Sequence, residues 1–281
     1  MAPRLSVIVP WANRPELSRT LAGNQGEFLA AGAEVIVANC GGDRELLARC
    51  VAEAGMALSV VHIDTSFNKA LALNLGVTQA SAPTLLFLDC DVELGRGSCT
   101  TALSLVSAAC AVTLDRVVES SPGENVAYPY LSAVIHTTEL EMADGRRVRI
   151  ETNRRRLNEG CRSAPGIVFV DREQFIEVDG MNSDLTGWGW EDLDLLVRLQ
   201  LQAGVRIERA GSATHLTHGD DRRCIDGVNR AGNEAWNAAM CLANYGLGHY
   251  YGTYGSDCER WAVAIEQRAE LGRNARLRGL E

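Results

Sequence analysis

The chain has 281 residues, 46% of them hydrophobic, and a formal net charge of −9. This length and composition allow one large domain with a full core, or one domain with a small appendage. The acidic balance argues against nucleic acid as a general partner. The nine cysteines are odd in number and form no CxxC pair. Neither a disulfide framework nor a zinc knuckle is therefore expected, and most cysteines should be small buried hydrophobes in a reducing compartment.

Strand and helix patterns alternate along the first hundred residues. Apolar β-branched runs predict strands at 5–9, 34–38, 58–63 and 84–88, and helical periodicity predicts helices at 15–29, 43–54 and 68–79. This order predicts a doubly wound, mainly parallel α/β sheet. Ligands of such sheets bind beyond the carboxyl ends of the strands, where this chain has four polar loops.

Two apolar segments raise the question of targeting. Residues 5–10 are too short for the core of a signal peptide. Residues 97–114 carry no charge, but they contain several serines and threonines, which favours a buried helix over a membrane span. We therefore expect a cytoplasmic protein with no membrane span.

The middle of the chain predicts a hairpin, with strands at 131–142 and 146–152 around Ala143-Asp144-Gly145. The basic run Arg154-Arg155-Arg156 is expected in a loop, where a solvated face is slightly favoured over contact with an acceptor or a phosphate. Further on, the pattern predicts strands at 166–170 and 205–209 and helices at 172–178, 191–202, 228–244 and 258–278. The last two helices suggest a C-terminal helical subdomain.

Two acids end the fourth predicted strand. Asp89 and Asp91 flank Cys90, and strand alternation aims both carboxylates at the ligand edge of the sheet. Such a pair suits a Mg²⁺ or Mn²⁺ ion that bridges to a diphosphate. His215 and His218 follow a later strand at an i, i+3 spacing, and at least one of them is expected to bind the metal.

A helix is predicted just past the third strand, in the segment FNKALALNLG at 67–76. The free N–H groups at its start favour an anion, and Lys69 adds a positive charge. Lys69 is the only lysine of the chain, which favours a contact with a phosphate over a solvated surface position.

The segment GWGWEDLDL at 187–195 is the most informative of the chain. Its glycines around two tryptophans predict a mobile aromatic loop, and its three acids predict the first turn of a helix. Helix capping accounts for some of the acids. A site that stacks a flat ligand on an indole and presents a carboxylate to it accounts for the acids and the tryptophans together.

These motifs, with PWANR at 10–14, Asn39 and FLDCDV at 87–92, occur in one order. That order resembles the metal-dependent, inverting glycosyltransferases of the GT-A fold, and most closely the β-1,4-galactosyltransferases and related bacterial family-2 enzymes. The resemblance covers roughly residues 4–218. It implies a GT-A domain at 1–218, with a nucleotide-binding half at 1–92 and an acceptor and catalytic half at 93–218, followed by the helical subdomain at 219–281.

The resemblance also implies roles for individual residues. Asp192 would be the catalytic base, Glu191 would grip the substrate, and Asp91 would bind Mn²⁺ (or Mg²⁺) with His218, His215 or both. Asp89 would touch the ribose or the metal, and Trp188 would close over the sugars. The nucleotide-sugar site would comprise Pro10, Trp11, Arg14, Asn39, Asn68, Lys69, Asp89, Cys90 and Trp188.

We therefore expect a hexosyl- or N-acetylhexosaminyltransferase that moves a sugar from a UDP-sugar to a hydroxyl of a saccharide, an aglycone or a peptide. Two alternatives remain. A sugar-1-phosphate nucleotidyltransferase normally needs a glycine-rich basic loop after the first strand, which PWANR is not. A non-catalytic carbohydrate-binding protein would keep the tryptophans without needing the acids and histidines together. The sequence leaves the sugar, the acceptor, the linkage and the oligomeric state open.

Overall fold

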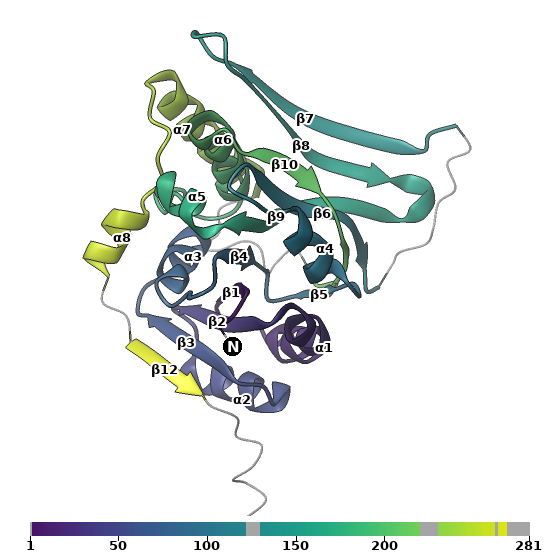
Figure 1. Cartoon of the computed structure of the whole chain (residues 1–281), viewed down its shortest axis with the longest axis vertical. Helices are drawn as coiled ribbons and strands as arrows, with labels where there is room; N and C mark the ends of the chain where they lie inside the picture. The colour runs from purple at the N-terminus through teal and green to yellow at the C-terminus, as the bar shows by residue number, and fades with distance from the viewer. Residues whose placement is uncertain (1, 122–129, 220–229, 262–263, 269–281) are drawn as a thin grey trace, which may run out of the picture.

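The computed structural model describes residues 2–121, 130–219, 230–261 and 264–268. Its main sheet has the strand order β12-β3-β2-β1-β4-β9-β6-β11-β5 (Figure 1). Four neighbouring strands pair in parallel: β1 (Leu5–Trp11), β2 (Ala33–Cys40), β3 (Leu58–Ile63) and β4 (Thr84–Phe87). The predicted α/β fold and the parallel half that begins it are confirmed.

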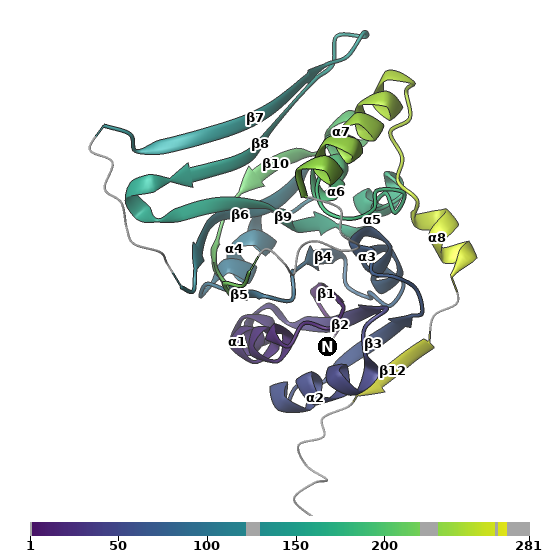
Figure 2. The same ribbon diagram turned by 180° about the vertical axis from the view of Figure 1, so that it is seen from behind.

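Helices cover both faces of these strands, as a doubly wound sheet requires (Figures 1 and 2). They are α1 (Glu16–Ala31), α2 (Arg44–Ala54) and α3 (Lys69–Val77). Alternation along β1 divides the core, because Val7 and Val9 pack with α1 and α2 while Ile8 packs with α3 on the other face. Two hydrophobic cores result, one on each face of the sheet.

The second half of the chain adds antiparallel strands. β9 (Cys161–Asp171) pairs antiparallel with both β4 and β6 (Cys110–Glu119), and so extends the sheet beyond its parallel part. The other elements are β5 (Val92–Leu94), α4 (Ser98–Leu105), α5 (Arg172–Glu177), α6 (Glu191–Ala203), β10 (Arg206–Arg209) and β11 (Ser212–His215). The predicted hairpin is present as β7 (Ala133–Glu141) and β8 (Arg147–Arg156), and it projects from the body (Figure 1).

Two local predictions for this half are wrong. Residues 97–114 do not form one buried helix, because α4 ends at Leu105 and Val106 is extended. The β-branched run that follows becomes β6, a buried strand between β9 and β11. The run Arg154-Arg155-Arg156 does not lie in a loop, because β8 continues to Arg156 and pairs with β9.

The C-terminal part is only partly helical. α7 (Arg230–Gly246) matches the first predicted helix and α8 (Tyr254–Arg260) the start of the second. The predicted helix at 258–278 is wrong at 264–268, where β12 (Ala264–Arg268) adds an antiparallel strand to β3. The new strand covers the open edge that β3 would otherwise expose. Residues 262–263 and 269–278 of that predicted helix lie outside the described residues.

Among the described helices, no segment has both the length and the apolar character that crossing a membrane requires. The eight described cysteines form no disulfide, and all but Cys258 are buried. Their burial agrees with the role of small core residues that the sequence predicts.

A buried ion pair fixes α6 to the rest of the fold. The Asp194 carboxylate accepts a hydrogen bond from Arg198 Nε at 2.7 Å and another from the Tyr245 hydroxyl at 2.7 Å. Arg198 Nη1 donates in turn to the carbonyl groups of Val178 and Gly180. Because Arg198 is only 1% exposed, each lost partner leaves a buried charge uncompensated.

We expect Tyr245→Phe to lower the free energy of unfolding by roughly 1–3 kcal/mol, because one oxygen of the buried Asp194 loses its donor. Tyr251→Phe is the matched control: Tyr251 is 55% exposed and its hydroxyl contacts Gln202 at 2.7 Å. It should change stability by no more than about 0.5 kcal/mol. Urea denaturation measures both, and equal stabilities for the two variants would contradict the prediction.

Candidate active site

One large cleft lies at the carboxyl ends of β1 and β4, with a volume of about 1390 Å³. It is lined by the loops after β1, β3 and β4, the end of β6, part of the β7–β8 hairpin, the inner part of β9, the GWGWED loop that leads into α6, and the two histidines at the end of β11 and just after it. Most predicted site residues line it, namely Pro10, Arg14, Lys69, Asp89, Cys90, Asp91, Trp188, Glu191, Asp192, His215 and His218. The fold thus gathers residues from most of the chain into one place.

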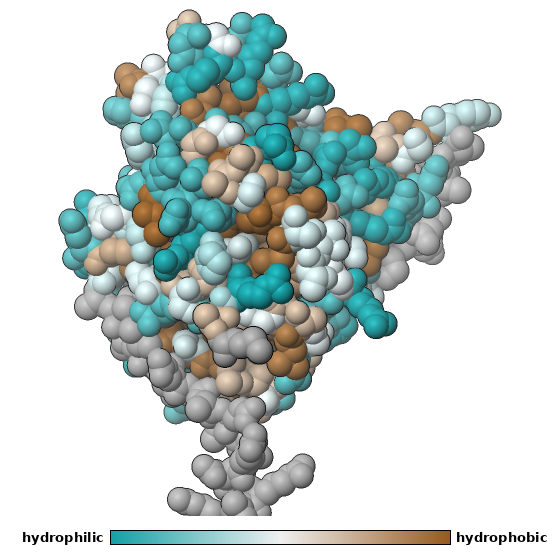
Figure 3. All heavy atoms as spheres, in the orientation of Figure 1, coloured by the Kyte–Doolittle hydropathy of each residue, from teal (hydrophilic) through white to brown (hydrophobic). Residues whose placement is uncertain are grey.

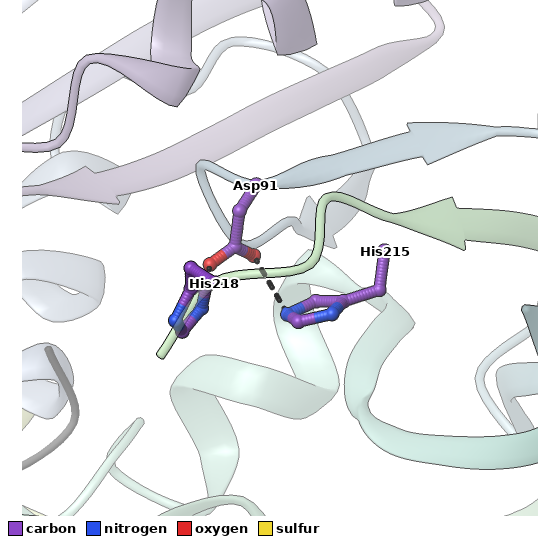
Figure 4. Close-up of side chains that lie close together, drawn as sticks. All are labelled: Asp91, His215 and His218. Atoms are coloured by element: carbon purple, nitrogen blue, oxygen red, sulfur yellow. Dashed lines mark hydrogen bonds and ion pairs between the residues drawn. The ribbon is translucent and has the colours of Figure 1, made fainter. Parts of the chain in front are cut away.

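Three potential metal ligands meet at one end of this cleft (Figure 4). His218 Nε2 lies 3.2 Å from Asp91 Oδ2, and His215 Nε2 lies 3.8 Å from Asp91 Oδ1. One ligand atom from each residue lies within 4.8 Å of the others. Both histidines therefore face the carboxylate, and geometry alone gives no reason to choose between them.

The remaining ring nitrogens are held by other groups. His215 Nδ1 lies 2.6 Å from Glu119 Oε2, and His218 Nδ1 lies 2.9 Å from the carbonyl of Gly219. A partner on Nδ1 fixes the ring and leaves Nε2 available, which is the usual arrangement of metal-bound histidines. Glu119 comes from β6, directly opposite His215 in the sheet.

Asp91 is a buried carboxylate with several charged neighbours. Burial, reinforced by Asp89, raises its pKa, while His215, Arg14 and His218 act in the opposite direction. Arg14 Nη2 contacts Asp91 Oδ2 at 2.8 Å. The Arg14 guanidinium and a metal ion would therefore compete for the same oxygen.

Lys69 joins the nucleotide half of the cleft to α6. Its Nζ lies 3.0 Å from Asp89 Oδ1 and 3.0 Å from Asp192 Oδ2. Burial lowers the pKa of the ammonium, but Asp192, Asp89 and Glu191 more than offset this and hold it well above its ordinary value. Lys69 therefore carries a fixed positive charge between two acids that are 103 positions apart in the sequence.

Asp192 lies at the start of α6 against β9. Burial raises its pKa to about 7, with Glu191 and Asp89 adding to the rise and Lys69 opposing it. Gly166 of β9 leaves room for it, since a Cβ at that glycine would lie 2.4 Å from Asp192 Oδ2. The result is a partly buried carboxyl group that can exchange a proton near neutral pH.

The three acids of this helix turn have different surroundings. Glu191 is 8% exposed, and its Oε2 finds no hydrogen-bond partner among the residues that the structure describes. Asp194 is enclosed by Arg198 and Tyr245. Asp192 and Glu191 line the cleft, whereas Asp194 does not. Asp194 therefore serves packing, and only the first two acids can meet a ligand.

The aromatic loop before α6 is held from behind by α7. Asn237 Nδ2 donates to the carbonyl groups of Thr186 and Gly189, and Asn233 Nδ2 donates to that of Thr186. The loop passes through left-handed backbone at Gly187, Gly189 and Trp190, whose φ angles are 75°, 104° and 71°. Such a conformation is costly for a tryptophan, so the contacts with α7 keep it in place.

Three residues of the predicted nucleotide-sugar site do not line the cleft. Trp11 is fully buried and donates its indole N–H to the carbonyl of Arg14. Asn39 is 2% exposed and bonds to both the N–H and the carbonyl of Gly42. Asn68 caps α3. All three shape the loops that carry the cleft residues, and their direct contact with the ligand stays a prediction.

Cys90 lines the cleft but is only 8% exposed, and burial raises the pKa of its thiol well above the ordinary value. Sequence reasoning also missed two contributors to the site. Glu119 of β6 lies opposite His215 of β11 in the sheet and contacts its ring, and Gly166 of β9 leaves room for the side chain of Asp192. Neither belongs to a recognisable motif, because both act through contacts that exist only in the folded sheet.

Comparison with known proteins finds similarity to galactosyltransferases over part of the chain. Residues 148–219 match the family model described as the N-terminal domain of galactosyltransferase. A human protein, β-1,4-galactosyltransferase 4, is 32% identical over 106 residues, which cover 36% of this chain and 28% of that protein. The matched part is therefore little more than a quarter of the relative's length.

Among solved structures, a mannosyltransferase from Pyrobaculum calidifontis in complex with GDP-Man and Mn²⁺ has a TM-score of 0.51 at 16% identity. The match covers 86% of this chain and 62% of that one. A Drosophila β-1,4-galactosyltransferase 7 mutant in complex with manganese, UDP-Gal and xylobiose has a TM-score of 0.46 at 18% identity, covering 81% and 76%. The likeness to the mannosyltransferase shows the GT-A fold, and the resemblance to galactosyltransferases is confirmed over residues 148–219.

Proposed function

We propose that this chain is a metal-dependent, inverting glycosyltransferase that moves a hexose or an N-acetylhexosamine from a UDP-sugar to an acceptor hydroxyl. One observation carries the proposal. Asp192, whose pKa is raised to about 7 by burial, lies in the same cleft as the cluster of Asp91, His215 and His218. Lys69 links Asp192 to Asp89 within that cleft. The base needed for a displacement and the cluster that suits a diphosphate-bound metal thus share one cleft.

In the proposed mechanism, Asp192 removes the proton of the acceptor hydroxyl as that oxygen attacks the anomeric carbon. The bond from the anomeric carbon to the donor's phosphate oxygen breaks, and UDP leaves with the electron pair. Lys69 keeps Asp192 oriented and favours its ionised form. Glu191 lies beside it with a buried, unsatisfied oxygen that a sugar hydroxyl can satisfy. Trp188 and the buried cleft wall exclude water, which would compete as nucleophile.

The residues present fit a divalent cation. One carboxylate and two imidazoles form a mixed oxygen and nitrogen donor set, and both rings are already oriented by partners on Nδ1. Asp91, His215 and His218 would hold Mn²⁺ or Mg²⁺. When bound there, the ion supplies positive charge to the departing diphosphate.

The two alternative functions fit the cleft less well. A nucleotidyltransferase needs no carboxylate poised to deprotonate an acceptor hydroxyl, which Asp192 provides here. A binding protein needs neither the metal cluster nor the buried Lys69. Mn²⁺-dependent release of UDP from a UDP-sugar, abolished by a chelator and accelerated by an acceptor, would separate the transferase from both alternatives.

We predict that Asp91→Ala weakens Mn²⁺-dependent UDP binding by more than 100-fold. Loss of an outer-shell partner alone commonly costs roughly 10–100-fold, and Asp91 lies inside the cluster. Asp64→Ala is the control, because the Asp64 side chain is 84% exposed and pairs with Arg44. Isothermal titration of UDP in saturating Mn²⁺ measures both, and equal affinity for Asp91→Ala and the parent would refute the metal assignment.

We predict that Asp192→Asn lowers kcat by roughly 10²–10⁴-fold, the range typical for loss of a general base. The amide keeps the size of the side chain and removes the proton acceptor. Affinity for UDP and Mn²⁺ should change little. Asp194 is enclosed by Arg198 and Tyr245, so it cannot replace Asp192 as the base. Near-parental turnover by Asp192→Asn would therefore exclude a single displacement in which Asp192 is the base.

The raised pKa of Asp192 predicts a pH profile. Only the carboxylate accepts a proton, so kcat/KM for the acceptor should fall about tenfold per pH unit below pH 7 and level off above it. The measurement is kcat/KM for the acceptor at saturating donor and Mn²⁺ between pH 5 and pH 9. A profile that stays flat down to pH 5 would mean that the base titrates near the ordinary value for an aspartate.

A further inference from the structure

The three arginines of the β8 run differ in their partners, although both Arg155 and Arg156 line the large cleft. Arg154 pairs with Glu151 at 2.7 Å, and Arg156 pairs with Asp115 at 2.9 Å. Arg155 lines the large cleft and is exposed. In the part of the chain that the structure describes, Arg155 has no carboxylate within ion-pair distance. It is the one member of the run whose charge is left for a ligand.

A second arginine stands directly across from it. Arg155 of β8 is in register with Arg162 of β9, and both line the cleft. Side chains directly opposite in antiparallel strands lie about 5 Å apart at Cβ, where like charges destabilise the pair. Arg162 is partly offset by Glu119 at 3.4 Å, but Arg155 is not. An oxyanion between the two guanidinium groups would remove the repulsion.

Their position in the cleft separates them from the reacting groups. Arg162 precedes Gly166, the glycine against Asp192, by four positions on β9. At about 3.3 Å per residue, four residues of strand place the backbone of Arg162 roughly 13 Å from that of Gly166, which lies beside Asp192. The cleft volume of about 1390 Å³ also exceeds the roughly 300–1,000 Å³ of ordinary small-ligand pockets, so there is room for a ligand that reaches both places.

The surrounding surface is polar. The hairpin β7–β8 projects from the body, and in the view of Figure 3 hydrophilic residues cover much of it. His136 and Asn153, which are paired across the hairpin, line the same wall of the cleft. Arg155 and Arg162 thus place basic groups in this wall in a chain of net charge −9, whereas the acids that we assign to catalysis lie at the start of α6.

We propose that Arg155 and Arg162 bind an oxyanion group of the acceptor. The acceptor is therefore an anionic molecule, and its negative charge lies far from the hydroxyl group that reacts. The proposal rests on the proposed transferase function. A planar guanidinium binds carboxylate and phosphate oxygens through paired hydrogen bonds. The shared chemistry is thus an oxyanion, carried by a uronic acid or by a phosphorylated sugar.

The test uses the protein saturated with UDP and Mn²⁺ and titrated with disaccharides in matched sets. Within one set, every disaccharide has the same sugar at one end, which is glucose, galactose or xylose. The members of the set differ in the other sugar, which is glucose, glucuronate or glucose 6-phosphate. We expect the anionic members to bind at least about 10-fold more tightly than the neutral one. The advantage should shrink as salt is raised.

Two variants locate the effect. Arg155→Gln should abolish the preference for the anionic members and leave UDP affinity in Mn²⁺ unchanged. Arg149→Gln makes the same change on the same strand at an exposed position that does not line the cleft, and it should keep the preference. Whether glucuronate or the phosphate gives the larger effect identifies the source of the oxyanion.

Equal affinities within every set, or no binding of any anionic member while UDP and Mn²⁺ bind, would overturn the proposal. A loss of UDP affinity in Arg155→Gln would also overturn it, since it would place the arginine on the donor. Failure of the parent protein to bind UDP with Mn²⁺ is a separate result, which counts against the proposed function itself.

Discussion

The arrangement of the cleft depends on a single buried ammonium group. Lys69 begins α3, and it holds Asp89 after β4 and Asp192 at the start of α6 within 3.0 Å. Glu191 lies close by as well, and burial raises the pKa of both Glu191 and Asp192 while Lys69 lowers it. Removing the charge would therefore favour the neutral forms of these two acids and leave Asp89 without its partner.

Helical geometry explains how one turn of α6 carries acids with different tasks. Consecutive residues of an α-helix point about 100° apart, so Glu191, Asp192 and Asp194 cannot share one environment. Asp194 turns into the core, where Arg198 and Tyr245 hold it. Glu191 and Asp192 turn toward the cleft. The same short sequence thus anchors the helix through Asp194 and presents Glu191 and Asp192 to the cleft, where we propose that they act on the substrate.

Local patterns predicted the parallel half of the fold well, because each of its strands and helices is decided by nearby residues. They failed where distant pairing decides the outcome. Residues 110–114 and 264–268 become strands because β9 and β3 offer partners to them. In the site, motif residues were found, but sequence alone could not separate Arg14, which faces the cleft, from Trp11 and Asn39, which support the loops. Glu119 and Gly166 were missed for the same reason, since only the folded sheet brings them to His215 and Asp192.

The left-handed loop at residues 187–190 has a consequence for how the protein is made. Its shape depends on Asn233 and Asn237, which lie more than forty positions further along the chain. Domains form from the amino terminus as the ribosome releases them, so every strand of the sheet except β12 and the cluster of Asp91, His215 and His218 can assemble before α7 exists. The turn that presents Asp192 is then completed late in synthesis. A nascent chain that has reached Gly219 holds every cleft residue assigned here to catalysis or to the metal, but lacks the helix that fixes their geometry.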